Sequence, residues 1–351
     1  MSTSRWFGLG LMTVVACGAA SDAAEGEGAA PSSQAPAPDT PAGAQPGGPA
    51  APPGSAEPSA HRCDPARAGA IGERELSLTI EGQKRTAYVH VPKGYDPAKG
   101  TALVLAFHGY GSNVTQMRGQ TGFDAASDAR GFIVAYAEGT GLASKGFNGG
   151  DCCGRPAWSD ETDDLGLARA IVKALSADYC VDPKRVYSAG FSNGGFMSYR
   201  FVCEAADVFA AVASVSGVLG TPPETCKPAR AVPILHVHGT ADTTVPYQGG
   251  PAAGGLGALA GINFRSVTDS VTHFRKSFAC AENATPIFAK GDTKCEAWSG
   301  CSAGARVELC TVEGGGHQWP GGQALPVGGK TSTDLATSER LLDFFAAHPM
   351  P

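Results

Sequence analysis

Residues 186–195 read VYSAGFSNGG, and this stretch decides the fold. Residues 186–189 are mostly apolar, as in a buried strand, and a helical pattern begins near Gly194. Between the two, Gly190, Ser192 and Gly194 have the spacing of a nucleophile elbow, a tight strand-to-helix turn that presents a serine. Glycine on both sides of Ser192 lets neighbouring backbone approach without a Cβ clash. The stretch therefore predicts Ser192 as a nucleophile at the start of a helix.

A serine nucleophile needs a base, and the base needs a carboxylate that orients it. In folds with this elbow the chain order is serine, aspartate, histidine. Asp242 lies in the loop beyond a strand-like run at residues 234–237, and ligand sites form beyond the carboxyl ends of such strands. The other aspartates considered lie in or near helices or in a cysteine-rich loop: Asp207, Asp269 and Asp292. Asp242 is the predicted carboxylate.

The predicted base is His317, which lies in the glycine-rich stretch 314–320 after a strand-like run. The other histidines after Ser192 fit less well. They precede Asp242, lie within a helix or lie near the terminus: His236, His238, His273 and His348.

Two backbone N–H groups are expected to hold the oxyanion that forms on the substrate. One belongs to Asn193, the residue after the nucleophile, and the other to the loop after the strand at residues 102–107. We choose Tyr110 for the second donor, with Gly109 and Gly111 as alternatives. His108, in the same loop, is expected to be structural.

The rest of the chain predicts an α/β fold. Two antiparallel-looking strands precede alternating strands and helices, which indicates a mostly parallel, twisted sheet with helices on both faces. Asp163 and Asp164 begin the helix at residues 163–179, where we expect carboxylates to cap backbone N–H groups. The other expected strands are 76–80, 86–91, 102–107, 132–135, 210–215, 234–237 and 307–312, and the other expected helices are 194–205, 267–278 and 335–347.

The N-terminal region indicates export. Residues 6–16 form an apolar run too short to span a membrane but typical of a signal peptide. Because the run ends at Cys17, residues 1–17 resemble a lipoprotein-type signal peptide, with an ordinary signal peptide as the alternative. Residues 18–60 contain nine Pro and seven Gly but no Leu, Ile, Val, Met or aromatic residue. They are expected to be a disordered linker to a catalytic domain at residues 61–351.

Ten of the eleven cysteines lie in the predicted domain, and this number favours disulfides in an oxidising compartment over a metal site. No metal or other cofactor is expected. Short loops suggest Cys203–Cys226, Cys295–Cys301 and Cys280–Cys310. The remaining four cysteines would share two bridges, with a bond between adjacent Cys152 and Cys153 disfavoured by strain.

Charge limits the partners. The net charge is −6 and no basic run appears, so neither nucleic acid nor an anionic membrane surface is an expected ligand. Membrane contact is expected only through a lipid anchor on Cys17, and the oligomeric state stays open.

Four separated motifs, HGYG (108–111), GFSNGG (190–195), HGTADTTVPY (238–247) and GGGHQWPGG (314–322), occur together with Cys152-Cys153-Gly154. Through these motifs, the chain resembles the secreted polyhydroxybutyrate depolymerases and feruloyl esterases over residues 70–350. The resemblance implies an α/β-hydrolase with disulfide-stabilised loops and a Ser192, Asp242 and His317 triad. Two features differ from the family: Phe274 and Phe278 lie where many members have a Trp, and no separate polymer-binding domain follows the core.

The resemblance predicts a serine carboxylesterase of feruloyl type that acts on plant cell-wall polysaccharide esters. The alternatives are a depolymerase of polyhydroxybutyrate, a short-chain polyester, and an inactive surface binding module. Trp319, two residues after His317, is predicted to line an aromatic acyl pocket or, alternatively, to be a packing residue.

Overall fold

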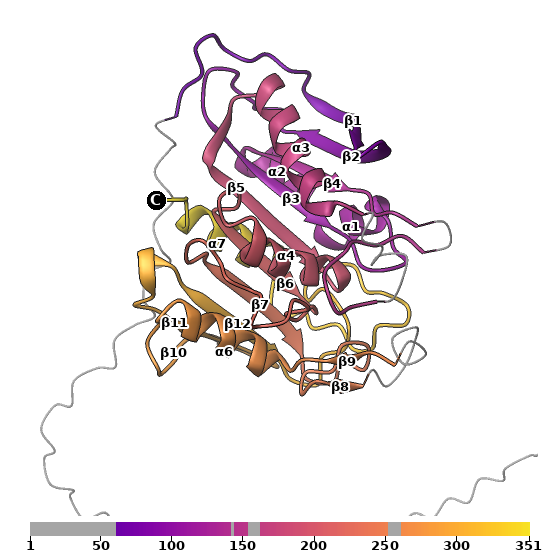
Figure 1. The fold of residues 1–351 in the computed structure, drawn as a ribbon, viewed down its shortest axis with the longest axis vertical. Helices are drawn as coiled ribbons and strands as arrows, with labels where there is room; N and C mark the ends of the chain where they lie inside the picture. The colour runs from indigo at the N-terminus through magenta and orange to yellow at the C-terminus, as the bar shows by residue number, and fades with distance from the viewer. Residues whose placement is uncertain (1–60, 142–143, 154–161, 252–260) are drawn as a thin grey trace, which may run out of the picture. The chain divides into compact units, whose positions relative to one another are not determined.

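The computed structural model describes residues 61–141, 144–153, 162–251 and 261–351. The predictions for residues 1–60, the Cys17 anchor among them, lie outside these ranges. The dominant feature is a ten-stranded sheet in the order β1-β2-β4-β3-β5-β6-β7-β12-β11-β10 (Figure 1).

The centre of the sheet is parallel and its two edges are antiparallel. Strands β4, β3, β5, β6, β7 and β12 pair in parallel, while β1 and β2 close one edge and β11 and β10 the other. The predicted α/β fold is thereby confirmed. The strands are β1 (Gly72–Ile80), β2 (Gln83–Val91), β3 (Thr101–Phe107), β4 (Phe132–Ala137), β5 (Val181–Phe191), β6 (Ala211–Val215), β7 (Ile234–Gly239), β10 (Thr285–Lys290), β11 (Thr293–Trp298) and β12 (Val307–Val312).

The central strands are buried on both faces, and β3 shows how. All seven of its residues are buried. Because side chains alternate across a strand, Leu103, Leu105 and Phe107 join one hydrophobic cluster, whereas Val104 and Ala106 join the other. The continuous apolar sequence of this strand follows from having a core on each side.

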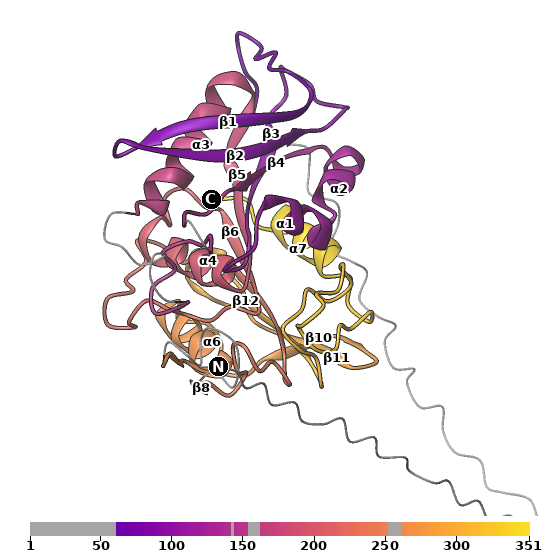
Figure 2. The same cartoon turned by 90° about the vertical axis from the view of Figure 1, so that its right-hand side faces the viewer.

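Helices cover both faces of the sheet, as predicted. In Figure 2, α3, α4 and α6 lie on one side of the strands and α1, α2 and α7 on the other. Each layer covers one of the two cores: Ile171 of α3 and Phe201 of α4 belong to the first cluster, and Met117 of α1 and Leu341 of α7 to the second. The helices are α1 (Val114–Thr121), α2 (Phe123–Arg130), α3 (Asp164–Asp178), α4 (Asn193–Glu204), α6 (Val267–Ser277), α7 (Thr337–Ala347) and the short 3₁₀ turn η1 (Ser302–Gly304).

Several elements lack a clear sequence pattern and were not predicted. Helices α1 and α2 have eight residues each, and α1 contains Gly119, which weakens a helix. Strand β10 has no buried residue in its TPIFAK sequence, so it shows no core-facing alternation. The hairpin of β10 and β11 and the two-residue strands β8 (Gly250–Pro251) and β9 (Asn263–Phe264) depend on tertiary contacts.

Five disulfides connect the ten cysteines of the domain, and their pairing differs in part from the prediction. Cys203–Cys226 is confirmed, but Cys295–Cys301 and Cys280–Cys310 are wrong. Cys295 faces Cys310 directly across the β11–β12 ladder, so these two pair and Cys280 bonds to Cys301. The observed pairs are Cys63–Cys180, Cys152–Cys153, Cys203–Cys226, Cys280–Cys301 and Cys295–Cys310.

The vicinal pair Cys152–Cys153, which the sequence disfavoured, is present. The physical reason lies elsewhere in the fold. Cys63 and Cys180, 117 residues apart, are brought to a Cα–Cα distance of 5.7 Å and bond to each other. The two adjacent cysteines are then left with each other.

The two aspartates at the start of α3 have different roles. Asp163 caps the helix as predicted, because its carboxylate accepts the N–H of Gly166 at 2.6 Å. Asp164 does not cap. Its buried carboxylate lies 2.5 Å from the guanidinium of Arg85 and accepts the N–H of Asn148 at 2.6 Å, so it ties α3 to strand β2.

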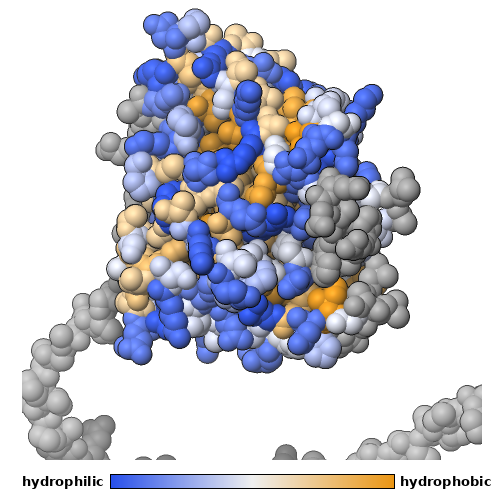
Figure 3. All heavy atoms as spheres, in the orientation of Figure 1, coloured by the Kyte–Doolittle hydropathy of each residue, from blue (hydrophilic) through white to orange (hydrophobic). Residues whose placement is uncertain are grey.

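The helices and the surface of the described residues bear on possible membrane contact. None of the helices in the described part of the chain has the length and apolar character needed to cross a bilayer. On the face seen in Figure 3, hydrophilic and hydrophobic side chains are interspersed over the described surface.

Candidate active site

Ser192 lies at the sharp turn between β5 and α4. Its φ and ψ are 52° and −118°, a backbone region that non-glycine residues rarely adopt. The flanking glycines are required sterically. A Cβ on Gly190 would lie 1.9 Å from the carbonyl oxygen of Gly194, and one on Gly194 would lie 2.0 Å from that of Phe107. The turn therefore has the geometry expected of a nucleophile elbow.

Asp242 and His317 come together from loops that follow β7 and β12. Nδ1 of His317 lies 2.7 Å from Oδ2 of Asp242. The other oxygen, Oδ1, accepts the backbone N–H groups of Thr244 and Val245, both at 2.8 Å. Burial would by itself raise the pKa of Asp242, but the charge of His317 and hydrogen bonds from His238 and His317 lower it below its ordinary value. The carboxylate is therefore ionised and can only accept.

Ser192 and His317 line the same cavity, which has a volume of about 340 Å³. Its wall contains the three turn residues after β3, a polar face of α1 and a larger apolar portion. The lining residues are Gly109, Tyr110, Gly111, Ser112, Gln116, Gln120, Cys153, Phe191, Ser192, Thr244, Val245, Phe264, His317, Leu325, Pro326, Val327 and Gly328. Val327 is 94% exposed, so an apolar side chain lies at the outer edge of the cavity.

The two predicted oxyanion donors are close to Ser192. Asn193 is the first residue of α4, where a backbone N–H has no intrahelical acceptor. In the β3 loop, Gly111 and Ser112 donate to the carbonyls of Lys145 and Gly109, while the N–H of Tyr110 has no backbone acceptor among the described residues. A Cβ on Gly109 would lie 3.3 Å from Cβ of Ser192, so this loop is packed against the elbow.

Comparisons with known proteins agree with this geometry. The putative esterase NocK from Nocardia uniformis subsp. tsuyamanensis is 33% identical over 325 residues, which cover 84% of this chain and 92% of the relative. The chain belongs to the feruloyl-esterase-like family of α/β-hydrolases. It is a carboxylic ester hydrolase.

Other matches are more partial. Feruloyl esterase B from Piromyces equi is 34% identical to this chain over 239 residues, which cover 66% of this chain and 42% of the relative. The acetyl xylan esterase from Aspergillus awamori shares the fold, with a TM-score of 0.55, 14% identity, and coverage of 78% of this chain and 99% of that one. A profile of the prolyl oligopeptidase family matches residues 121–222.

Trp319 is buried in the esterase and does not line the cavity. It is 0% exposed, packs edge-to-face against Phe123, and donates its indole N–H to Ser338 at 3.1 Å. This position corrects the prediction that Trp319 lines an acyl pocket and fits the alternative of a packing residue. The two side chains point in different directions: that of Trp319 faces the helical layer of α1, α2 and α7, whereas that of His317 faces the cavity.

His108 is structural, as expected. It is fully buried, its Nε2 accepts the N–H of Gly139 at 3.0 Å, and its Nδ1 lies 2.7 Å from the carbonyl oxygen of Gly109. The ring therefore holds the β3 loop that carries Tyr110.

A chain of buried side chains behind Asp242 was missed by the sequence analysis. The hydroxyl of Tyr199 lies 2.6 Å from Nδ1 of His236, and Nε2 of His236 lies 3.0 Å from Nδ1 of His238. Nε2 of His238 is 2.8 Å from the Val245 carbonyl and 3.4 Å from Asp242. The spacing of His236 and His238 was the available signal, since residues two apart on a strand share a face.

The acceptors fix the direction of this chain. A carbonyl can only accept, so Nε2 of His238 carries a proton. For neutral rings, Nδ1 of His238 then accepts from His236, whose own Nδ1 accepts from Tyr199. Burial, and to a smaller extent the charge of His238, lower the pKa of His236 well below its usual value, so that this ring is neutral.

The side chain of Asn193 is a second feature that the sequence did not reveal. Its amide donates to the carbonyl of Phe147 at 2.9 Å and accepts the Phe147 N–H at 2.7 Å. It also lies 3.5 Å from Sγ of Cys152. Asn193 therefore fixes the loop with the vicinal disulfide against the elbow.

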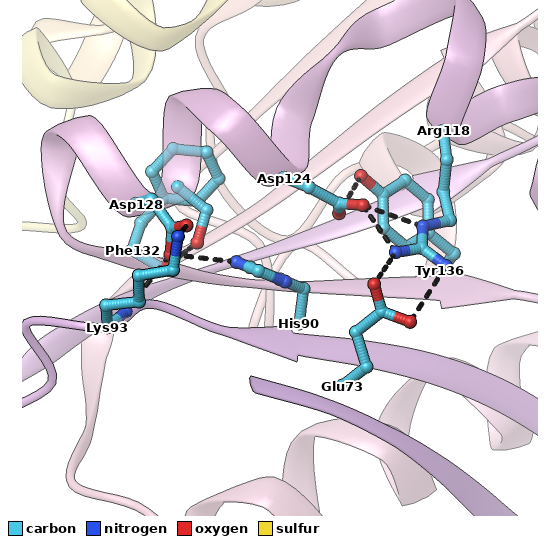
Figure 4. A network of polar contacts seen from close by, with 9 residues as sticks. Glu73, His90, Lys93, Arg118, Asp124, Asp128, Phe132 and Tyr136 are labelled. Carbon is cyan, nitrogen blue, oxygen red and sulfur yellow. Dashed lines mark hydrogen bonds and ion pairs between the residues drawn. The ribbon is translucent and has the colours of Figure 1, made fainter. Parts of the chain in front are cut away.

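Two groups of potential metal ligands occur in the described part of the esterase. The first group consists of His61, Cys63 and Cys180. Its two cysteines are bonded to each other in a disulfide, which leaves His61 as the remaining donor. In the other, Glu73, His90 and Asp124 lie around Arg118, whose guanidinium is 2.5 Å from Glu73 and 2.6 Å from Asp124. Figure 4 shows this arginine between the two carboxylates.

This second group is better explained as a structural network. Tyr136 donates to Asp124 at 2.8 Å, and His90 lies 3.0 Å from Asp128. The contacts join strands β1, β2 and β4 to helices α1 and α2. The expectation that the reaction uses no metal stays a prediction.

Proposed function

We propose that the esterase hydrolyses hydroxycinnamate esters of plant cell-wall polysaccharides, with Ser192, His317 and Asp242 as its catalytic triad. The observation that carries the proposal is the 2.7 Å contact between His317 and Asp242 in loops beside a cavity that also contains Ser192. The substrate class is supported by the relatives named as feruloyl esterases.

The proton positions support the role of each residue. Because Asp242 is an ionised acceptor, Nδ1 of His317 carries the proton, and Nε2 is free to accept one. His317 takes the proton of Ser192 as its oxygen attacks the ester carbonyl, and then passes it to the departing alcohol. Water, activated by the same ring, cleaves the acyl-enzyme and releases the acid.

The charge of the tetrahedral intermediate would be held by the N–H groups of Asn193 and Tyr110. Removing one such donor typically costs about 2.7–4 kcal/mol of transition-state stabilisation. Asn193 has a further role in this proposal, since its side chain fixes the neighbouring loop through Phe147.

Ser192→Ala tests the proposal. The variant should fold, because an alanine side chain is no larger, and should lose hydrolysis of methyl ferulate. Retained hydrolysis would overturn the nucleophile assignment. For the wild-type enzyme, release of ferulate should exceed release of 3-hydroxybutyrate from matched esters. The reverse preference would favour the polyhydroxybutyrate depolymerase.

We also propose that the esterase is exported, with residues 61–351 as the catalytic domain and residues 18–60 as its tether to a lipid on Cys17. Five disulfides in the domain support an oxidising compartment. A multiply acylated cysteine anchors stably, whereas one acyl chain gives marginal binding. Mass spectrometry of the mature N-terminus in the native host should find lipid on Cys17. An unmodified terminus beyond Cys17 would mean free secretion.

A further inference from the structure

Gln120 is a buried polar residue in the wall of the cavity that contains Ser192. It lies near the end of α1 and is 2% exposed. Its side-chain Nε2 is buried and has no hydrogen-bond partner among the residues that the structure describes. Buried amides are nearly always paired, and an unpaired one lowers stability. Such a group in the wall of a ligand cavity calls for a partner that arrives with the ligand.

Some other polar side chains at or near this wall already have partners. The hydroxyl of Ser112 donates to Oε1 of Gln116 at 2.6 Å. Next to the base, the amide of Gln318 bonds Leu325 through both of its polar atoms, at 2.8 and 3.0 Å. Among the described residues that line the cavity, Gln120 is the one with a buried side-chain atom lacking a partner.

The surroundings of Gln120 limit the chemistry of that partner. Much of the cavity wall is apolar, with Phe191, Val245, Phe264 and Leu325 among its residues. A sugar, with a hydroxyl on nearly every carbon, would leave many polar groups unpaired against such a wall. An aromatic ring with one or two oxygen substituents fits better, because the ring contacts the apolar residues and its oxygen meets one amide.

We propose that Gln120 binds the ring hydroxyl or methoxy oxygen of a hydroxycinnamoyl acyl group and so determines acyl specificity. The inference rests on the proposed function and specifies it. Since a half-turn of the terminal torsion exchanges Nε2 and Oε1, the amide can donate to a methoxy oxygen or pair with a phenolic hydroxyl. Gln120 touches the substrate away from the ester, so it affects selectivity more than the chemical step.

The test compares kcat/KM for two esters that differ by one hydroxyl, methyl 4-hydroxycinnamate and methyl cinnamate. We expect the wild-type enzyme to favour the hydroxylated ester. Gln120→Met, which keeps the length of the side chain but removes the amide, should lower that preference about five- to tenfold, the effect of one hydrogen bond. The loss should be larger on the hydroxylated ester than on methyl cinnamate.

The matched control is Gln323→Met. Gln323 is an exposed glutamine that does not line the cavity. It lies close to the same helix, because a Cβ built on Gly119, the residue before Gln120, would be 2.6 Å from Oε1 of Gln323. This variant should keep the wild-type preference. Thermal melting checks that both variants fold. If Gln120→Met does not fold, Gln120→Leu serves as a second apolar variant.

Other outcomes overturn the inference. An unchanged preference in Gln120→Met, or an equal loss on both esters, would make Gln120 a structural residue.

A second pair of esters, with the same cinnamoyl group on methanol and on glucose, tests whether Gln120 binds the alcohol part of the substrate. A loss confined to the glucose ester would assign Gln120 to sugar binding instead. If the wild-type enzyme cleaves simple acetate esters but no hydroxycinnamate ester, the proposed function itself fails.

Discussion

Oδ2 of Asp242 lies 2.7 Å from Nδ1 of His317, and this contact joins two loops that are 75 residues apart. The carboxylate is held on its other oxygen by two backbone N–H groups. Asp242 therefore has a fixed position, and its orientation sets the orientation of the histidine.

Asp242→Asn should leave the loop largely in place but reduce kcat about 10³–10⁴-fold, because an amide can stabilise the wrong tautomer of His317. Asp207→Asn is the control: Asp207 pairs with Arg169 at 2.6 Å on the surface and does not line the cavity. Steady-state hydrolysis of methyl ferulate measures both. Equal activity of the two variants would contradict the role given to Asp242.

Tyr199→Phe should destabilise the fold by about 1–2 kcal/mol, because it leaves the buried Nδ1 of His236 without its donor. The ring stack between Tyr199 and Phe274 is kept in this variant. Tyr247→Phe removes a hydroxyl that pairs with Thr311 at a partly exposed position, where water can substitute, so it should cost less. Urea unfolding compares the two, and a larger cost for Tyr247→Phe would refute the argument.

Stability should fall as the pH drops below about 6.5, the usual value for histidine in an unfolded chain. The buried His236 has a lowered pKa, so the unfolded chain takes up a proton that the folded one does not. Its contribution is therefore present above the unfolded pKa and is lost as the pH falls below it. Between pH 7.5 and 5.5 this amounts to at most about 1.4 kcal/mol for one group.

His236→Gln should have a smaller change in unfolding free energy over the same interval than the wild-type enzyme. Urea titrations at the two pH values provide the comparison. If both proteins lose the same stability, the pH dependence comes from other groups.

Removing Cys63–Cys180 should cost more stability than removing Cys295–Cys310. The first closes a separation of 117 residues and the second one of 15. Loop-closure entropy predicts about 5 and about 3 kcal/mol, respectively. Double Cys→Ala variants of each pair, compared by urea unfolding, check the order. The opposite order would show that strain or packing, and not chain entropy, decides.

Gly194→Ala should prevent folding or cost more than about 4 kcal/mol, because its Cβ would collide with the Phe107 carbonyl. Gly94→Ala is the matched control. A Cβ there has no atom within 4 Å, so the variant should be neutral or up to about 1 kcal/mol more stable. Circular dichroism and melting curves measure both, and a well-folded Gly194→Ala protein would contradict the packing of the elbow.

The sequence by itself determined the elements whose local pattern carries the information. The elbow around Ser192 was readable because its steric needs lie within a few consecutive residues, with glycine where a Cβ would clash. The central strands were readable because burial on two faces demands continuous apolar runs, as in β3. The expectation that Asp242 and His317 act together followed from chain order and from their positions in the loops after strands β7 and β12.

The tertiary structure decided what depends on residues far apart in the chain. Cys295 pairs with Cys310 because β11 and β12 align them, and this register depends on how the two strands pair and not on the sequence of either strand alone. The sequence did not show that Trp319 faces the helical layer while His317, two residues earlier, faces the cavity. The unpaired amide of Gln120 likewise appears only when its neighbours are in place, since a missing hydrogen bond is a property of packing and not of residue type.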